Sequence, residues 1–343
     1  MFRSGIHPLQ PGVSGSHAVP VGPGTLLECG RYRSRSTYDL PVVTETLVST
    51  LDRRLLATRC VGPDDGWPVV LFTGVPNSRL VAPDEATAHS AKVRVLTFDR
   101  PGYGGSTPLG RNQDPRNLAD LHSILSHFGI DEFSALGWSA GARHAVAAAA
   151  GFEQRCHTVG LVSPLGPVTS ATYRTTLPRI RALQIAALTR VPRHLRRPAA
   201  KRVLGPTAKR AKADPHGRLA DLRSRANAAD RALQDDPAIA EVLLADVIQT
   251  FAREGAGWFN DVAQMTCPWP ARPSAITQSV TIWHGRDDPE VSPNGAEALA
   301  EDFPCAELRL IDRAGHLLLF DAWLEVLTAL ELNRTPRPVD LER

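Results

Sequence analysis

Short apolar runs recur along the chain and alternate with segments of helical periodicity. Each run is about as long as a buried strand and too short to be a buried helix. The runs cover residues 68–74, 93–99, 133–138, 157–164, 279–285 and 306–312. Strands that alternate with helices are typical of βαβ units, in which the strands are parallel. The pattern therefore predicts an α/β fold with a doubly wound, mainly parallel sheet.

The segments around these runs carry helix and turn signals. Asp114 is expected to cap a helix that opens at Pro115 and closes at Gly129. A helix of small residues is expected over 140–150. Before the first run, residues 42–62 have β-branched stretches on both sides of a Leu-Asp-Arg-Arg turn, which predicts a hairpin.

The alternation stops in the second half of the chain and then resumes. We expect an α/β core of residues 41–168 and 270–335, interrupted by an inserted helical domain at 169–269. Residues 1–40 are rich in Gly, Pro and Ser, so we expect a disordered tail there. Residues 336–343 are expected to form a C-terminal tail.

The predicted insertion contains a strongly basic stretch, residues 174–225, which includes RHLRRPAAKR. Such a stretch would suit an anionic partner, but a solvated helix face is the favoured interpretation in an Arg-rich chain. DNA binding is disfavoured because no aromatic residue lies within RRPAAKR. Further along, Asp236 is expected to cap a helix with Pro237 at its first position.

Composition excludes several classes of protein. The formal net charge is +3, too small to indicate a nucleic-acid or membrane partner. No apolar run is long enough to span a membrane, and no signal peptide is recognised. The five cysteines lack the spacing of a metal site, so we expect reduced thiols, no bound metal and a cytoplasmic location. They are Cys29, Cys60, Cys156, Cys267 and Cys305.

The sequence GWSAG, at 137–141, joins the predicted strand 133–138 to the predicted helix 140–150. A Gly-x-Ser-x-Gly motif at such a boundary is typical of a sharp turn that exposes a nucleophilic serine. Here that serine is Ser139. The backbone N–H of Ala140, at the start of the helix, would then be able to stabilise a developing oxyanion.

A serine hydroxyl needs a base within hydrogen-bond reach, and the base needs an orienting carboxylate. Two histidines lie at the ends of predicted strands. His316 follows the last strand, and His284 ends the strand at 279–285. The carboxylate candidates are Asp287 and Asp288, which come directly after that strand.

Four segments, taken together and in this order, resemble the α/β-hydrolase superfamily, as a serine hydrolase with a helical cap domain. LFTGVPNSR resembles its oxyanion loop, and FDRPGYGGS resembles its Asp-Arg-Pro-Gly-Tyr-Gly-x-Ser signature. GWSAG resembles its nucleophile elbow, and HGRDDPEV with AGH resembles its acid and histidine segments. Their joint occurrence is far more specific than any one of them.

The resemblance implies a role for each matching residue. Ser139 matches the nucleophile, His316 the base and Asp288 the acid. The backbone N–H groups of Val75 and Ala140 match the oxyanion hole. No metal or cofactor is implied.

The chain departs from the family pattern at Thr73, where a histidine usually precedes the glycine of the oxyanion loop. The inserted domain is similar to the family's cap, which would cover the substrate pocket. Aromatic residues and one methionine either line this pocket or pack the cap onto the core: Trp138, Trp258, Phe259, Met265 and Trp269. An apolar acyl or alkyl group is the expected ligand of such a pocket.

A serine nucleophile argues against haloalkane dehalogenases and epoxide hydrolases of this fold, which need aspartate at the elbow. We therefore expect a carboxylic ester hydrolase that acts on a small acyl compound through an acyl-enzyme. An amidase, a C–C hydrolase and a catalytically inert binding protein with this fold are the alternatives. The molecule is expected to be a monomer or a homodimer.

Overall fold

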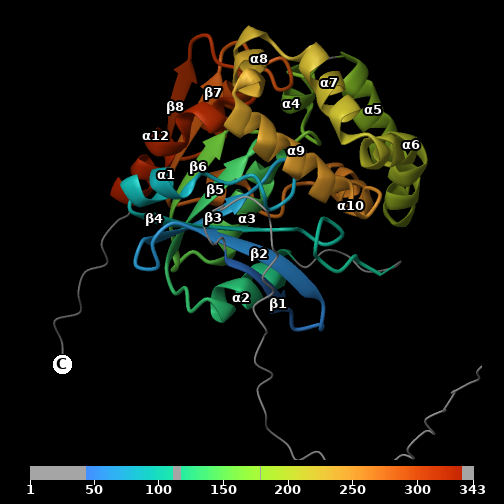
Figure 1. The fold of residues 1–343 in the computed structure, drawn as a ribbon. Coiled ribbons are helices and arrows are strands. Elements are labelled where there is room, and N and C mark those ends of the chain that lie inside the picture. The colour runs from blue at the N-terminus through green and yellow to red at the C-terminus, as the bar shows by residue number, and fades with distance from the viewer. Residues whose placement is uncertain (1–43, 111–116, 178, 334–343) are drawn as a thin grey trace, which may run out of the picture. The chain divides into compact units, whose positions relative to one another are not determined.

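The computed structural model describes residues 44–110, 117–177 and 179–333 (Figure 1). The predictions for Asp114, for Pro115 and for the tails at 1–40 and 336–343 lie outside these residues.

The described residues contain an eight-stranded sheet in the order β1-β2-β4-β3-β5-β6-β7-β8. The first two strands form the predicted antiparallel hairpin, β2 is antiparallel to β4, and the remaining pairs are parallel. The α/β fold class and the mainly parallel sheet are thus confirmed. The strands are β1 Thr44–Ser49, β2 Leu55–Val61, β3 Trp67–Phe72, β4 Val93–Phe98, β5 Phe133–Trp138, β6 Cys156–Val162, β7 Ser279–Gly285 and β8 Ala306–Ile311.

Helices pack on both faces of this sheet, which makes it doubly wound. Alternate residues of each strand point to opposite faces, so that Val70 and Phe72 join one apolar cluster while Val69 and Leu71 join the other. The first cluster contains residues of α2 (Asn117–His127), α3 (Ala142–Gly151) and α11 (Pro293–Asp302). The second contains residues of α1 (Glu85–Ser90) and α12 (Leu318–Leu332).

The last two of these helices, α1 and α12, were not among the helices expected from the sequence. The signal for α12 is present, because Trp323, Val326, Leu327 and Leu330 follow helical spacing and are all buried. This helix directly follows the segment that carries His316, so its packing against the sheet fixes where that segment ends.

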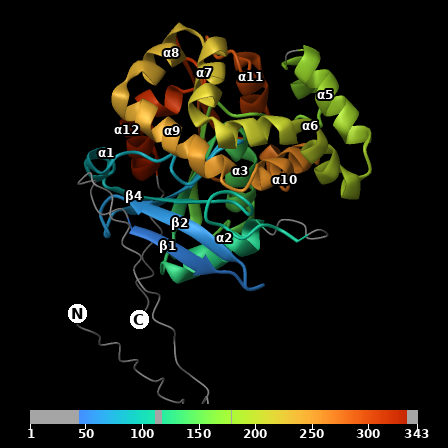
Figure 2. The same ribbon diagram turned by 45° about the vertical axis from the view of Figure 1, so that its right-hand side comes forward.

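Between β6 and β7 the chain is helical, and we call α4–α10 the inserted helices. Asp236 caps α9 as predicted, because its side chain accepts hydrogen bonds from the N–H groups of Ala238 and Ile239. Figure 1 shows α8 and α9 on the side to which the arrows of β5 and β6 point, and Figure 2 shows α6 beside α10. The inserted helices are α4 Ala171–Thr175, α5 Arg179–Arg190, α6 Arg193–Ala213, α7 Pro215–Arg225, α8 Ala228–Asp235, α9 Pro237–Phe251 and α10 Ala256–Met265.

The inserted helices have an apolar cluster of their own, built from α6, α9 and α10 around Phe251 and Phe259. The basic helix α6 also makes polar contacts, since Arg197 donates to the carbonyl oxygens of Leu109 and Gly110. In the part of the chain that the structure describes, no helix combines the length and apolarity needed to cross a bilayer.

Candidate active site

Ser139 occupies a strained turn between β5 and α3. Its φ is +54°, a left-handed conformation that side chains other than glycine rarely adopt. Glycine is required on both sides of it. A Cβ on Gly141 would lie 1.9 Å from the carbonyl oxygen of Phe72, and a Cβ on Gly137 would lie 2.7 Å from the Cα of Ala142. The two glycines therefore let the strand and the helix approach closely around the serine.

Three side chains from distant segments meet at this turn. The Nε2 atom of His316 lies 3.1 Å from the Oγ atom of Ser139, and its Nδ1 atom lies 2.8 Å from Oδ2 of Asp288. The other carboxylate oxygen of Asp288 accepts hydrogen bonds from the backbone N–H groups of Glu290 and Val291. With a proton on Nδ1, His316 donates to Asp288 and leaves Nε2 free to accept the serine proton.

The local electrostatics favour a carboxylate next to an imidazole that gains a proton readily. Burial lowers the pKa of His316, but the adjacent Asp288 carboxylate outweighs it and leaves this pKa above its usual value. Burial raises the pKa of Asp288, and His316 outweighs that effect, so the pKa of Asp288 is lowered. Asp288 is therefore ionised at neutral pH although its side chain is fully buried.

The structure separates the remaining candidates for base and acid. His284 lies behind the carboxylate, with Nε2 3.0 Å from the carbonyl oxygen of Val291 and 3.5 Å from Asp288. Burial lowers the pKa of His284, which favours its neutral form. Asp287 is exposed, and its backbone carbonyl accepts a hydrogen bond from Asn227. Of the two aspartates after β7, only Asp288 contacts His316.

The loop after β3 lies directly against the serine. A Cβ on Gly74 would lie 3.3 Å from the Cβ of Ser139, a tight contact, so glycine there eases the close approach of the loop. Arg100, which is buried, holds the loop by donating to the carbonyl oxygens of Thr73 at 2.9 Å and Gly74 at 2.8 Å. The Gly74 carbonyl belongs to the same peptide unit as the N–H of Val75, so Arg100 orients that N–H.

Arg100 also explains how Thr73 is accommodated. The Thr73 hydroxyl oxygen accepts a hydrogen bond of 3.2 Å from the same guanidinium. The loop is thus organised from the segment after β4, in FDRPGYGGS.

Comparison with known families decides the classification. Residues 68–322 match the family model described as alpha/beta hydrolase fold. The chain belongs to the α/β hydrolase fold family. Its sheet order, its helices on both faces and its serine turn after β5 are those of an α/β hydrolase, and hydrolase activity is the activity that this membership supports.

Two curated relatives share part of the sequence of this α/β hydrolase. A proline iminopeptidase from Xanthomonas citri is 33% identical over 102 residues, which cover 29% of this chain and 33% of that protein. A probable proline iminopeptidase from Leptolyngbya boryana is 30% identical over 104 residues, covering 29% of this chain and 32% of that protein. The match spans about a third of the length of these relatives.

Solved structures resemble the α/β hydrolase along most of its length. A thermophilic esterase from Thermogutta terrifontis has a TM-score of 0.58 at 20% identity, covering 84% of this chain and 97% of that one. The enol-lactonase from Burkholderia xenovorans has a TM-score of 0.59 at 19% identity, covering 84% and 100%. A bromoperoxidase from Bacillus anthracis has a TM-score of 0.60 at 19% identity, covering 84% and 98%. At these identities the likeness shows a common fold.

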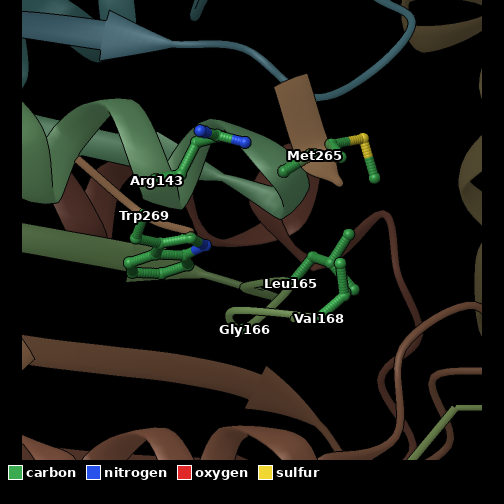
Figure 3. Close-up of a pocket in the computed structure, with 7 residues that line it drawn as sticks. Arg143, Leu165, Gly166, Val168, Met265 and Trp269 are labelled. Atoms are coloured by element: carbon green, nitrogen blue, oxygen red, sulfur yellow. The ribbon is translucent and has the colours of Figure 1, made fainter. Parts of the chain in front are cut away.

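A small cavity of about 10 Å³, which is room for about one water molecule, adjoins the serine turn (Figure 3). Two of the expected pocket residues, Met265 and Trp269, line it together with Ala140. Its remaining lining residues were not expected from the sequence: Arg143, Leu165, Gly166 and Val168.

The other three aromatic residues that were candidates for lining or packing do not line this cavity. Trp258 and Phe259 stack on each other within the apolar cluster of the inserted helices. Trp138 is buried beside His316 and donates from its indole N–H to the His316 backbone carbonyl at 3.2 Å. It packs behind the histidine and does not line this cavity.

Three buried aspartates of the inserted helices reach the loops of the site, and the sequence analysis did not identify them: Asp230, Asp246 and Asp261. Asp246 accepts hydrogen bonds from Asn77 and from both the N–H and the hydroxyl of Ser78. Burial raises its pKa to about 6, although these donors oppose the change. Asp261 accepts from Arg100. In this way α9 is tied to the loop that follows β3, and α10 is tied to Arg100, the residue that holds this loop.

Proposed function

We propose that the protein is a serine hydrolase that cleaves a carboxylic ester, or a related acyl compound, through a covalent acyl-enzyme. The supporting observation is the hydrogen-bonded series Ser139–His316–Asp288, at the carboxyl ends of three parallel strands. Serine, aspartate and histidine follow one another in the chain order that this fold uses for a triad.

In the proposed mechanism, His316 accepts the Ser139 proton as the hydroxyl attacks the substrate carbonyl. Asp288 keeps His316 in the tautomer that this step needs and stabilises the imidazolium. The backbone N–H groups of Val75 and Ala140 stabilise the oxyanion, and one such donor is worth about 10²- to 10³-fold in rate. His316 then protonates the leaving group. Water, activated by the same histidine, cleaves the acyl-enzyme and restores the serine.

A second candidate is hydrolysis of an amide bond, because both curated relatives are named as proline iminopeptidases. The same residues would serve, with an amine in place of an alcohol as leaving group. A panel of p-nitrophenyl esters and amino acid p-nitroanilides, including the proline derivative, separates the two candidates by their kcat/KM values.

The decisive experiment labels the protein with a fluorophosphonate probe, followed by peptide mass mapping. We expect one adduct, on Ser139, that is absent from Ser139→Ala. Ser90→Ala, which removes an exposed serine hydroxyl from α1, serves as the control and keeps the adduct. An unlabelled wild-type protein would instead support the inert binding protein.

A further inference from the structure

Asp246, on α9, holds the loop after β3 from the side of the inserted helices. Its Oδ1 atom accepts hydrogen bonds of 2.7 Å from both the N–H and the hydroxyl of Ser78. Its Oδ2 atom accepts one of 2.6 Å from the side-chain amide of Asn77. The hydroxyl of Thr250, one turn further along α9, donates to Oδ1 at 3.4 Å. The loop thus supplies the three shorter hydrogen bonds, from two consecutive residues.

The carboxylate of Asp246 has no counter-ion among the described residues. It is only 2% exposed, and no Lys, Arg or His nitrogen of these residues lies within the 4.0 Å of an ion pair. Burial raises its pKa to about 6, so the carboxyl is ionised at neutral pH at a cost in folding free energy. A neutral side chain would pack here without that cost. What the carboxylate adds is an acceptor on each oxygen, which lets it hold Asn77 and Ser78 together.

Two buried side chains attach the loop on either side of Val75. Arg100 donates to the carbonyl oxygen of Gly74, the residue before Val75, and Asp246 accepts from Ser78, three residues after it. Neither side chain belongs to the loop, since Arg100 follows β4 and Asp246 lies on an inserted helix. The direction of the Val75 N–H, the candidate oxyanion donor, therefore depends on both attachments.

The amide of Asn77 extends this contact toward Ser139. Because its Nδ2 atom donates to Asp246, its Oδ1 atom faces away from the carboxylate. A Cβ on Gly74 would lie 2.9 Å from that Oδ1 atom and 3.3 Å from the Cβ of Ser139, so both side chains lie close to Gly74. An asparagine in place of Asp246 would turn an N–H donor toward either Asn77 or Ser78, and one of these contacts would be lost.

We infer that Asp246 is a positioning residue for the proposed reaction, because by holding Asn77 and Ser78 it fixes the direction of the Val75 N–H toward the developing oxyanion. This inference rests on the proposed function. Asp246 touches no reacting atom in the proposed mechanism. Its effect passes through the loop and acts on the transition state more than on substrate binding. Helix α9 thereby takes part in forming the oxyanion hole.

The test replaces Asp246 with asparagine, which keeps the size of the side chain and removes the charge. For a p-nitrophenyl ester we expect kcat to fall about 10- to 100-fold while KM changes by less than about 3-fold, a smaller loss than removal of a whole oxyanion donor. Glu241→Gln, which removes an exposed carboxylate from the same helix, should leave both constants unchanged. An unchanged kcat in Asp246→Asn overturns the inference.

A transition-state analogue separates positioning from a general loss of folded protein. In a trifluoromethyl ketone with the acyl chain of the ester, the Ser139 hydroxyl adds to the carbonyl, its proton passes to His316, and the resulting oxyanion needs the N–H of Val75. The Ki of this ketone should rise in Asp246→Asn by the factor by which kcat/KM falls. If the variant merely contained less folded enzyme, the Ki of the remaining enzyme would equal the wild-type value, and that result overturns the inference.

A second variant guards against misfolding of the first. Asn77→Ala keeps the carboxylate and both of its hydrogen bonds to Ser78, and should show the same pattern with a smaller factor in kcat and in Ki. A change in KM alone in this variant would contradict the role assigned to Asp246.

Hydrogen exchange measured by mass spectrometry does not depend on activity. Residues 73–79 should exchange at least about 10-fold faster in Asp246→Asn than in the wild type, while residues 279–285 exchange equally. Equal exchange at 73–79 overturns the inference. If esters are hydrolysed and Asp246→Asn keeps the wild-type kcat, the inference fails and the proposed function stands. If esters never acylate Ser139, the proposed function fails, and hydrogen exchange still decides whether Asp246 holds the loop.

Discussion

Asp230, on inserted helix α8, accepts hydrogen bonds from the backbone N–H groups of His316 at 3.0 Å and Leu317 at 2.8 Å. The carboxylate is buried against Gly315, where a Cβ would lie 2.3 Å from its Oδ1 atom. The loop that carries the candidate base is therefore held by a residue from outside the sheet, and the position of His316 depends on the docking of α8.

Replacing Asp230 with asparagine should displace this loop. The amide offers one acceptor in place of two and turns an N–H donor toward a backbone N–H. We expect kcat to fall about 10-fold with little change in KM, and the free energy of unfolding to fall by about 1–3 kcal/mol. Asp221→Asn, in the exposed part of α7, is the control. Steady-state kinetics and urea denaturation measure both effects, and an unchanged kcat would show that α8 does not position His316.

The pH profile of hydrolysis should follow the titration of His316. Only the neutral imidazole accepts a proton, so kcat/KM rises with pH through a pKa above 6.5, the direction in which Asp288 moves it. In Asp288→Asn burial, the largest single influence, is opposed only by the weaker attraction of Glu290 and Asp230, so this limb should move to lower pH. The maximal rate should drop about 10³- to 10⁴-fold. Asp287→Asn, which changes only an exposed carboxylate, should keep the wild-type profile. A limb that stays in place in Asp288→Asn would contradict the assignment.

Arg100 and Thr73 form a matched pair for testing the oxyanion loop. Arg100→Lys loses the planar group that reaches Thr73, Gly74 and Asp261 together. We expect kcat to fall about 10- to 100-fold, because the N–H of Val75 is no longer oriented. Thr73→Ala removes only the hydroxyl contact and should cost less than about 5-fold. A larger loss in Thr73→Ala than in Arg100→Lys would locate the organising contact in the hydroxyl.

Two glycines should respond oppositely to alanine. In Gly141→Ala the new Cβ would meet the Phe72 carbonyl oxygen at 1.9 Å, so the turn at Ser139 must distort. We expect a loss of about 3 kcal/mol or more in the free energy of unfolding and loss of activity. In Gly205→Ala, on α6, nothing lies within 4 Å of the new methyl group. This variant should gain about 0.5–1 kcal/mol in helix stability. Thermal denaturation with an esterase assay distinguishes these outcomes.

The sequence was sufficient for features that arise from local patterns. The strands at 133–138 and 279–285 are found at the predicted residues, because an apolar run bounded by turns is a local signal. The proximity of Ser139, Asp288 and His316 could also be predicted from the sequence, because each residue follows a strand and the carboxyl ends of parallel strands lie at one edge of the sheet.

Contacts between the inserted helices and the core could not be predicted from the sequence. Arg100 and Asp261 are 161 residues apart, and Asp230 is 86 residues from His316. An aspartate on a polar helix has the same local pattern whether it is solvated or buried against a loop. The sequence gives a weak indication that Arg143 is buried, because the helix after GWSAG is rich in alanine and offers no polar face on which an arginine would be solvated.

The aromatic residues of α10 show where the sequence left two roles open. Trp258 and Phe259 were candidates either for lining the pocket or for packing the inserted domain onto the core. Both belong to the apolar cluster of the inserted helices, to which α6 contributes mainly alanines. Size and location in sequence do not distinguish packing within a subdomain from contact with a ligand.

The register of β3 against β5 pairs Phe72 with Gly137. The two candidate oxyanion donors, Val75 and Ala140, each come three positions after this pair. The distance between the two N–H donors therefore depends on the number of residues that follow this pair in each segment. Inserting or deleting one residue in either segment would shift one donor relative to the other. Directed evolution of this scaffold should accordingly keep the lengths of 72–75 and 137–140 constant and vary loop length only beyond them.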